Sequence, residues 1–163
     1  MPLKAKKSII KQHKRGSPLN LHPLYEQDFC AWLDQNTQLL RQNRLADIDK
    51  VHLAEELEDM GKRERRALES YLRNVILHLL KWQYQPAFRG SSWRQSIRNG
   101  RIAIDKIIQD SPSLQTKINR FIENEYAAAV ADAVDETGLD STIFPQSCPF
   151  TAAQIRDHAF FPA

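Results

Sequence analysis

The chain has 163 residues, of which 42% are hydrophobic and 26% charged, and 23 lysines and arginines against 20 aspartates and glutamates give a net charge of +3. This composition excludes a low-complexity disordered chain, and two cysteines exclude a disulfide scaffold. No apolar run approaches the ~18 residues of a membrane span. We therefore expect a flexible basic tail over residues 1–22 and a single helical domain over residues 23–163.

The first 22 residues carry six bases and no acid. They lack the apolar core of a secretory signal, so we expect a cytoplasmic protein that does not associate with a membrane. Gly16, Ser17 and Pro18 interrupt any helix in this tail. Two interpretations of the tail stay open: it contacts nucleic acid or an acidic surface, or it only keeps the protein in solution.

Charge is segregated along the chain. The consecutive segments 1–22, 23–61, 62–106 and 107–163 carry net charges of +6, −6, +8 and −5. Blocks of this kind predict surfaces of opposite sign. In one interpretation the acidic and basic helices pack together and neutralise one another. In the other, the basic 62–106 segment is an exposed face that meets a partner.

Helical periodicity begins just after the tail. Apolar residues recur every three to four positions over 24–43, which predicts one helix with Pro23 at its start. A second helical stretch runs from 48 to 84, with Asp47 as its cap. This stretch is either one helix of about 36 residues or two helices bent at Gly61, and we expect the bend or break because mean helices have about 11–12 residues. The predicted buried stripe of this stretch includes Val51, Leu57, Met60, Leu68, Tyr71 and Trp82.

The second half of the chain predicts two further helices. One opens at Ser91 or Ser92, where Ser92 and Gln95 fit a capping box. Ser111 and Pro112 predict the start of the next, which Gly138 ends. Buried positions include Trp93, Ile97, Gly100 or Arg101, Ile104, Leu114, Phe121 and Tyr126.

The last segment contains the prolines of a strap and the signal of a short helix. Pro145 and Pro149 predict an extended path after residue 141, and Thr151 with Gln154 fits a capping box. No segment alternates as a strand does. The sequence therefore predicts an all-α fold: a helical bundle of about four to five main helices, an extended proline-containing C-terminal strap and a short last helix.

Two titratable residues are candidates for catalysis. Glu64 falls in the predicted apolar stripe, where a carboxylate must find a partner such as Arg98 or Arg101, or shift its pKa. His78 shares a face with Trp82. Glu64 is either half of a structural ion pair or a general base, and His78 is either a core histidine or a catalytic one.

A basic stretch with aromatic residues is the candidate binding site. Arg94, Arg98 and Arg101 recur at helical spacing, and Arg89 and Trp93 lie close in the sequence. Arginines interleaved with aromatic residues are typical of nucleic-acid binders, although the same face also suits an acidic helix of this chain. The binding residues that we predict are Arg89, Trp93, Arg94, Arg98 and Arg101.

No metal or cofactor is predicted. His52 and Glu56 lie four residues apart and share a helix face, as two metal ligands can. Metal sites in helical bundles use a Glu-x-x-His pair on each of two helices, and this chain has no such pair. A glycine-rich phosphate loop is also absent from the sequence.

Several motifs together resemble a known family. They are Tyr25-Glu26-x-Asp28-Phe29-x-x-Trp32-Leu33, LAEELEDMGKRERRALES at 53–70, HLLKWQYQP at 78–86, SWRQSIRNGR at 92–101, DSPSL at 110–114 and FPQSCPFT at 144–151. In this order they resemble the bacterial, largely cyanobacterial, domain-of-unknown-function 29 family over residues 24–158. The resemblance implies an all-α bundle and supplies no residue roles.

Two functions follow from these observations. The first is a binding or adaptor module that meets nucleic acid or an acidic protein through the basic 62–106 face. The alternative is an enzyme whose glutamate, histidine and arginine side chains, with Glu64 and His78 among them, converge in a pocket between helices.

Overall fold

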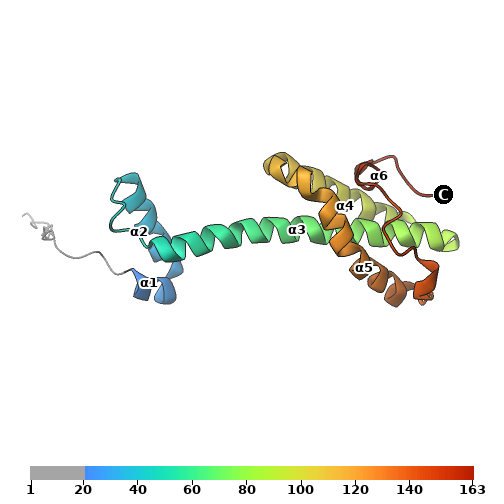
Figure 1. The fold of residues 1–163 in the computed structure, drawn as a ribbon, viewed down its shortest axis with the longest axis horizontal. Coiled ribbons are helices and arrows are strands. Elements are labelled where there is room, and N and C mark those ends of the chain that lie inside the picture. The colour runs from blue at the N-terminus through green and yellow to red at the C-terminus, as the bar shows by residue number, and fades with distance from the viewer. Residues whose placement is uncertain (1–20) are drawn as a thin grey trace, which may run out of the picture. The chain divides into compact units, whose positions relative to one another are not determined.

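The computed structural model describes residues 21–163, which are helical and contain no strand (Figure 1). This confirms the predicted all-α bundle. The α-helices are α1 (His22–Gln27), α2 (Phe29–Arg41), α3 (Lys50–Tyr84), α4 (Ser91–Asp110), α5 (Ile118–Thr137) and α6 (Ala152–Arg156). Short 3-10 turns, η1 (Pro86–Phe88), η2 (Pro112–Lys117) and η3 (Ser141–Ile143), connect several of them. The predicted tail lies almost entirely outside the described residues.

Two compact units divide the described chain, one ending at Leu57 and one beginning at Glu58. The first has a small core of Leu21, Trp32 and Leu39. The second has the main core, to which α3, α4, α5 and the C-terminal segment all contribute. The single domain expected over residues 23–163 stays a prediction, because two packing clusters that share one helix can still unfold as one.

The predicted helix over 24–43 is wrong in one respect, because it is divided at Asp28. The backbone of Asp28 leaves the helical region at φ −151° and ψ 89°. Its carboxylate accepts a hydrogen bond from the backbone N–H of Ala31 at 2.9 Å and so caps α2. A short acidic side chain that satisfies an otherwise unpaired N–H favours a new helix start over a continuous helix.

The expected break at Gly61 is absent, since α3 is one helix of 35 residues. A single glycine costs a helix only about 1 kcal/mol, and strong helix formers surround it. Val51 and Leu57 are 66% exposed and Met60 is 60% exposed, so the predicted stripe is buried only from Leu68 onward, and there Tyr71 is an exception at 41%. Helical periodicity identified the apolar face of α3 correctly but not how far the core extends along it.

The observed helix ends agree with some of the predicted caps and differ from others. The box at Ser92 and Gln95 is wrong, because α4 already begins at Ser91, after Gly90. Ser111 precedes the 3-10 turn η2, and α5 begins only at Ile118. The Gly138 stop is confirmed by its left-handed φ of 69°, and the capping box of Thr151 and Gln154 is confirmed in both of its hydrogen bonds.

None of the helices within residues 21–163 combines the length and apolar character that crossing a bilayer would require.

Gly100 marks a close approach of α4 to α3. A Cβ atom at Gly100 would lie 2.5 Å from Cγ2 of the buried Val75, whereas a Cβ at Gly61 would meet only the Arg65 side chain at 3.5 Å. We expect Gly100→Ala to lower the free energy of unfolding by about 1–3 kcal/mol, because overpacking forces the helices apart. Gly61→Ala should raise it by about 0.5–1 kcal/mol, since alanine is the better helix former.

Urea denaturation of both variants, followed by circular dichroism at low protein concentration, measures the two changes. Equal stabilities for the two variants would contradict the close packing at Gly100.

Candidate functional site

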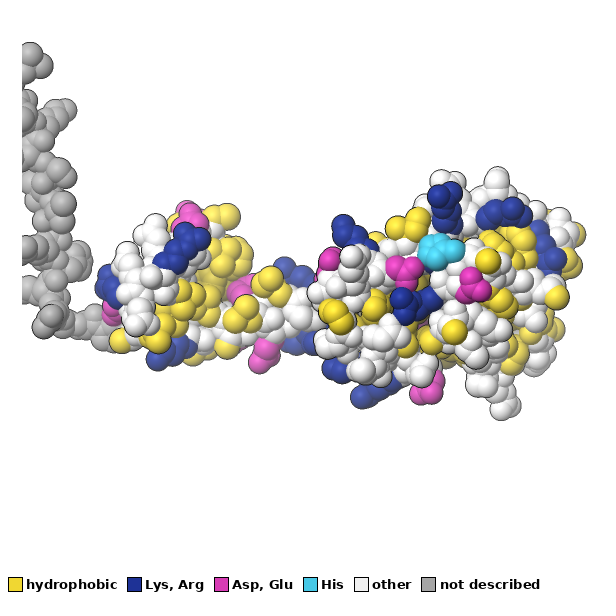
Figure 2. Space-filling model, turned by 90° about the horizontal axis from the view of Figure 1, so that it is seen from above, with side chains coloured by type: hydrophobic (Ala, Val, Ile, Leu, Met, Phe, Trp, Pro, Cys, Tyr) yellow, Lys and Arg dark blue, Asp and Glu magenta, His cyan; other side chains and the backbone are white. Residues whose placement is uncertain are grey.

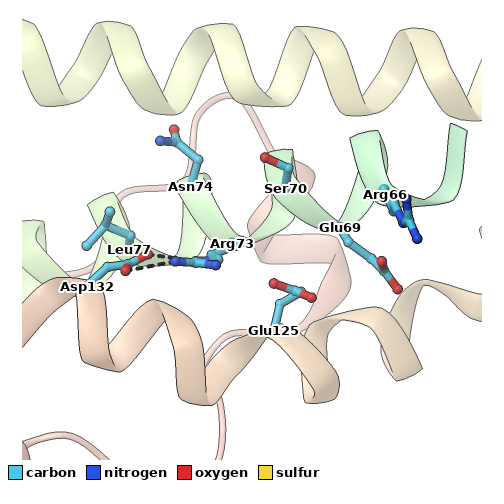
Figure 3. A pocket seen from close by; sticks show the side chains of 8 residues that line it. All are labelled: Arg66, Glu69, Ser70, Arg73, Asn74, Leu77, Glu125 and Asp132. Atoms are coloured by element: carbon cyan, nitrogen blue, oxygen red, sulfur yellow. Dashed lines mark hydrogen bonds and ion pairs between the residues drawn. The ribbon is translucent and has the colours of Figure 1, made fainter. Parts of the chain in front are cut away.

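The basic segment has few carboxylates of its own. From Ser70 to Ile104 the sequence contains no aspartate or glutamate. Two of its bases are neutralised from α5: Arg73 donates to Asp132 at 2.6 and 2.8 Å, and Lys81 pairs with Glu136 (Figure 3 shows Arg73 and Asp132). The acidic partners of residues 70–104 therefore come from the 107–163 block, and they neutralise only some of the bases in this stretch.

Arg101 does not share an exposed face with Arg94 and Arg98, as the spacing had suggested. It is 1% exposed, and its guanidinium donates hydrogen bonds to backbone oxygens of the C-terminal segment. The acceptors are Ile155 at 2.7 Å, Gln154 at 3.2 Å and Phe160 at 2.9 Å. Burial lowers the pKa of Arg101, but an arginine stays charged far above neutral pH. Arg101 thus holds the C-terminal segment against α4.

The other predicted arginines are exposed: Arg89, Arg94 and Arg98. Within residues 21–163 no carboxylate forms an ion pair with any of the three. The Arg89 Nε donates to the backbone oxygen of Trp82 at 2.7 Å. The guanidinium carbons of Arg89 and Arg94 lie 5.5 and 5.4 Å from the centre of the Trp82 ring, so one buried indole places both cations.

Trp93 is half-buried and faces a cation that is already paired. The Lys81 Nζ lies 4.7 Å from its ring centre, and Lys81 also pairs with Glu136. Trp93 therefore contributes to the floor of this region, with only part of its surface open to a ligand.

Phe88 is the residue that sequence reasoning missed. It ends the turn η1, directly before Arg89, and is 69% exposed. An aromatic residue between Pro86 and Arg89, in a segment too short for a buried helix face, was the available signal. We define the Arg–Phe face as Phe88, Arg89, Trp93, Arg94 and Arg98. On the side drawn in Figure 2, basic side chains of the second unit lie among exposed hydrophobic ones.

Two hollows lie between α3 and α5. One, of about 500 Å³, receives Glu69 and Glu125 as well as the Arg73–Asp132 pair (Figure 3). The neighbouring one, of about 400 Å³, has five basic side chains and a single carboxylate, Glu69. Its basic residues are Lys62, Arg65, Arg66, Lys117 and Arg120. Positive potential therefore extends beyond the Arg–Phe face along the second unit.

The two candidate catalytic residues do not meet. Glu64 and His78 lie 14 residues apart on the continuous helix α3, which separates them by about 21 Å at ~1.5 Å per residue. The His78 Nδ1–H donates to the backbone oxygen of Asn74 at 2.8 Å, and burial lowers the pKa of its imidazole. His78 thus has the contacts of a structural histidine, and Arg101 is occupied elsewhere. The geometry gives no support to a catalytic pocket formed by these residues.

In the first unit, polar contacts converge on Asp49. Its Oδ2 accepts hydrogen bonds from Trp32 Nε1 at 3.1 Å and from His52 Nδ1 at 2.7 Å, and its Oδ1 accepts the His52 backbone N–H at 3.3 Å. Asp49, rather than the predicted Asp47, therefore caps α3. Burial raises the pKa of the Asp49 carboxyl, but the hydrogen bonds from His52 and Trp32 outweigh it, so the pKa is lowered.

Tyr25 completes this cluster. Its ring stacks on His52 with ring centres 4.1 Å apart, and its hydroxyl donates to Glu56 at 2.8 Å. The hydrogen bond to Glu56 raises the pKa of Tyr25 to about 12. His52 and Glu56, which the sequence placed on one helix face, are thus joined through Tyr25.

A family model described as domain of unknown function DUF29 matches residues 24–161. The chain belongs to the DUF29 family. This confirms the resemblance that the motifs indicated. Neither the curated proteins nor the solved structures gave a match. Membership of DUF29 assigns no activity to the chain.

Substitution of Arg101 tests whether its hydrogen bonds hold the C-terminal segment of this DUF29 protein in place. We expect Arg101→Met to lower the free energy of unfolding by at least about 2 kcal/mol, because it leaves buried carbonyl oxygens without donors. Hydrogen exchange over residues 150–163 should speed up at least tenfold. Arg98→Met, on the next exposed turn, serves as the control and should change stability by less than about 0.5 kcal/mol. Identical exchange in the two variants would contradict this role of Arg101.

Asp49 gives a pH-dependent test. Because its pKa is lowered in the folded state, its contribution to stability is present above the ordinary value of 3.8 and is lost as the pH falls through the folded value. Asp49→Asn should lower the free energy of unfolding by about 1–3 kcal/mol at pH 7. Below pH ~4 the variant should lose less stability than the wild type, because it lacks this carboxylate.

The stability of the first unit can be measured by amide hydrogen exchange of residues 21–57 from pH 3 to 7. Asp47→Asn, which removes only the Arg44 pair, is the matched control. If stability falls equally at low pH in Asp49→Asn and in the wild type, a titratable group other than Asp49 controls that loss.

Proposed function

We propose that this DUF29 protein is a binding module that takes a polyanion, and specifically a single-stranded nucleic acid, on its Arg–Phe face. The observation that carries the proposal is the group of three exposed arginines beside an exposed phenylalanine, without a carboxylate partner among the described residues. Phosphates pair with arginines, and an exposed aromatic ring stacks on a base of any sequence.

The arrangement favours a nucleic acid over an acidic protein. Phe88 is the most exposed of the large hydrophobic side chains in the described chain, at 69%. A strand of phosphates with unstacked bases uses both the ring of Phe88 and the guanidinium groups of Arg89 and Arg94. An acidic peptide uses only the charges. The placement of two guanidinium groups around one indole also suits successive phosphates of a strand better than scattered carboxylates.

The hollow between α3 and α5 supports the same function. Arg66, Lys117 and Arg120 line it, and its one carboxylate is Glu69. A strand that leaves the Arg–Phe face would thus meet further positive charge on the second unit. Such a surface raises the rate of encounter with polyanions through its long-range field.

Binding of a labelled oligonucleotide tests the proposal. The six bases of residues 1–22 should first be replaced by serine, so that the tail does not bind the probe. We expect a fluorescein-labelled 20-nucleotide poly(dT) strand to bind with micromolar affinity at 50 mM salt. Raising the salt from 50 to 200 mM should weaken binding by roughly 10–20-fold. This estimate assumes about three phosphate contacts, each of which contributes about −0.7 to the slope of log K against log salt concentration.

Two variants separate charge from stacking. Arg94→Glu/Arg98→Glu should weaken binding at least tenfold, and Phe88→Ala should weaken it by about 5–20-fold, or ~1–2 kcal/mol. Arg41→Glu/Lys50→Glu, with the same change in net charge at exposed positions of the first unit, is the control. No binding at 20 mM salt would overturn the proposal. Equal binding of poly-glutamate, with no effect of Phe88→Ala, would favour an acidic protein partner instead.

A further inference from the structure

The N-terminal half of α3 has a charge pattern that is mirrored about the bond between Met60 and Gly61. Residues 55–59 before it read Glu-Glu-Leu-Glu-Asp, and residues 62–66 after it read Lys-Arg-Glu-Arg-Arg. Counted outward from this bond, every acid on one side has a base at the same distance on the other. The next residues outward match as well, with alanine against alanine and leucine against leucine. Two pairs do not match: Met60 with Gly61, on either side of the bond, and Leu57 with Glu64.

This segment also exposes apolar surface. Leu57 and Met60 lie three residues apart, on one face of the helix, and are 66% and 60% exposed. Gly61 borders the same face, and the nearest atom to a Cβ placed there is the end of the Arg65 side chain. Large exposed hydrophobic side chains beside a glycine form a face that a second helix can approach closely.

We infer that a second copy of this chain packs antiparallel on this segment of α3, about a two-fold axis that passes between Met60 and Gly61. A two-fold axis makes the contact self-complementary, so the acidic run of each copy faces the basic run of the other. Met60 then covers the partner's Gly61, and Leu57 lies along the stem of the partner's Glu64. A parallel pair would place like charges opposite each other, so the sequence selects the antiparallel one.

The helical register brings specific charges together. Glu56 and Arg63 are seven residues apart and lie on one edge of the apolar face, and Glu58 and Arg65 lie on the other edge. In an antiparallel pair equivalent edges meet. Glu56 therefore faces the partner's Arg63, and Glu58 faces the partner's Arg65, each contact occurring twice. Glu56 can take part because its hydrogen bond to Tyr25 uses only one carboxylate oxygen.

Ion pairs within α3 explain only part of this pattern. Asp59 pairs with Lys62 at 2.9 Å, and Glu58 lies four residues before Lys62, an order that stabilises a single helix. Such pairs do not require Leu57 and Met60 to be exposed, nor a centre of symmetry. Because only about three turns of helix make contact, we expect a weak dimer that is sensitive to salt.

Sedimentation equilibrium of the full chain tests the inference. We expect dimerisation in the range of 10–100 µM at 20 mM salt, weakened at least fivefold at 500 mM. Glu56→Arg/Glu58→Arg and Arg63→Glu/Arg65→Glu should each be monomeric, because like charges then face each other. An equimolar mixture of these two variants should form a heterodimer, and a chain that carries all four changes should dimerise as the wild type does.

The matched control is Glu55→Arg/Asp59→Arg, which changes the net charge equally on the outer face of α3 and should retain the dimer. Circular dichroism verifies that each variant is as helical as the wild type. A wild type that stays monomeric at 200 µM and 20 mM salt, or a mixture that forms no heterodimer, would overturn the inference. The residues tested here are distinct from the Arg–Phe face, so a negative result leaves the oligonucleotide experiment unaffected, and the reverse also holds.

Discussion

The second unit depends on the placement of Arg101 inside its core. A buried guanidinium is tolerated only when its donors are satisfied, and here the acceptors are backbone oxygens of residues 154, 155 and 160. These oxygens belong to a segment without long secondary structure, which needs such partners in order to be buried. One side chain therefore satisfies its own charge and holds the C-terminal segment, whose Phe150 and Ile155 complete the hydrophobic core.

The distribution of carboxylates decides which arginines are left for a ligand. α5 supplies Asp132 and Glu136 to the α3 residues Arg73 and Lys81. It does not pair with the start of α4, and the acid-free sequence there leaves Arg89, Arg94 and Arg98 exposed. Neutralisation and exposure were the two interpretations of the basic segment, and each applies to a different part of it. The proposed nucleic-acid face is the part that lacks counter-charge.

In the first unit the central polar residue is a carboxylate, Asp49, whereas in the second unit it is Arg101. Asp49 caps α3 and binds the side chains of Trp32 and His52, so one residue connects the start of a long helix to the small core of α2. Asn36 strengthens this connection, because its amide oxygen accepts the Asp49 backbone N–H at 2.8 Å while its nitrogen donates to the Trp32 backbone oxygen. Buried polar groups that are fully paired in this way define a single arrangement of the two helices.

The sequence by itself determined the all-α class, the helical extent of residues 50–84, the Gly138 stop and the Thr151 cap, because periodicity and capping are local properties. Its predicted binding residues Arg89, Trp93, Arg94 and Arg98 form part of the proposed Arg–Phe face and stay a prediction. Only the tertiary structure decided that Arg101 is buried, that Glu64 and His78 stay apart, and that Leu57 and Met60 are exposed. The spacing of an arginine along a helix is the same whether its side chain is exposed to solvent or hydrogen-bonded to a carbonyl about 50 residues away in the sequence. The difference depends on long-range packing, which no local pattern contains.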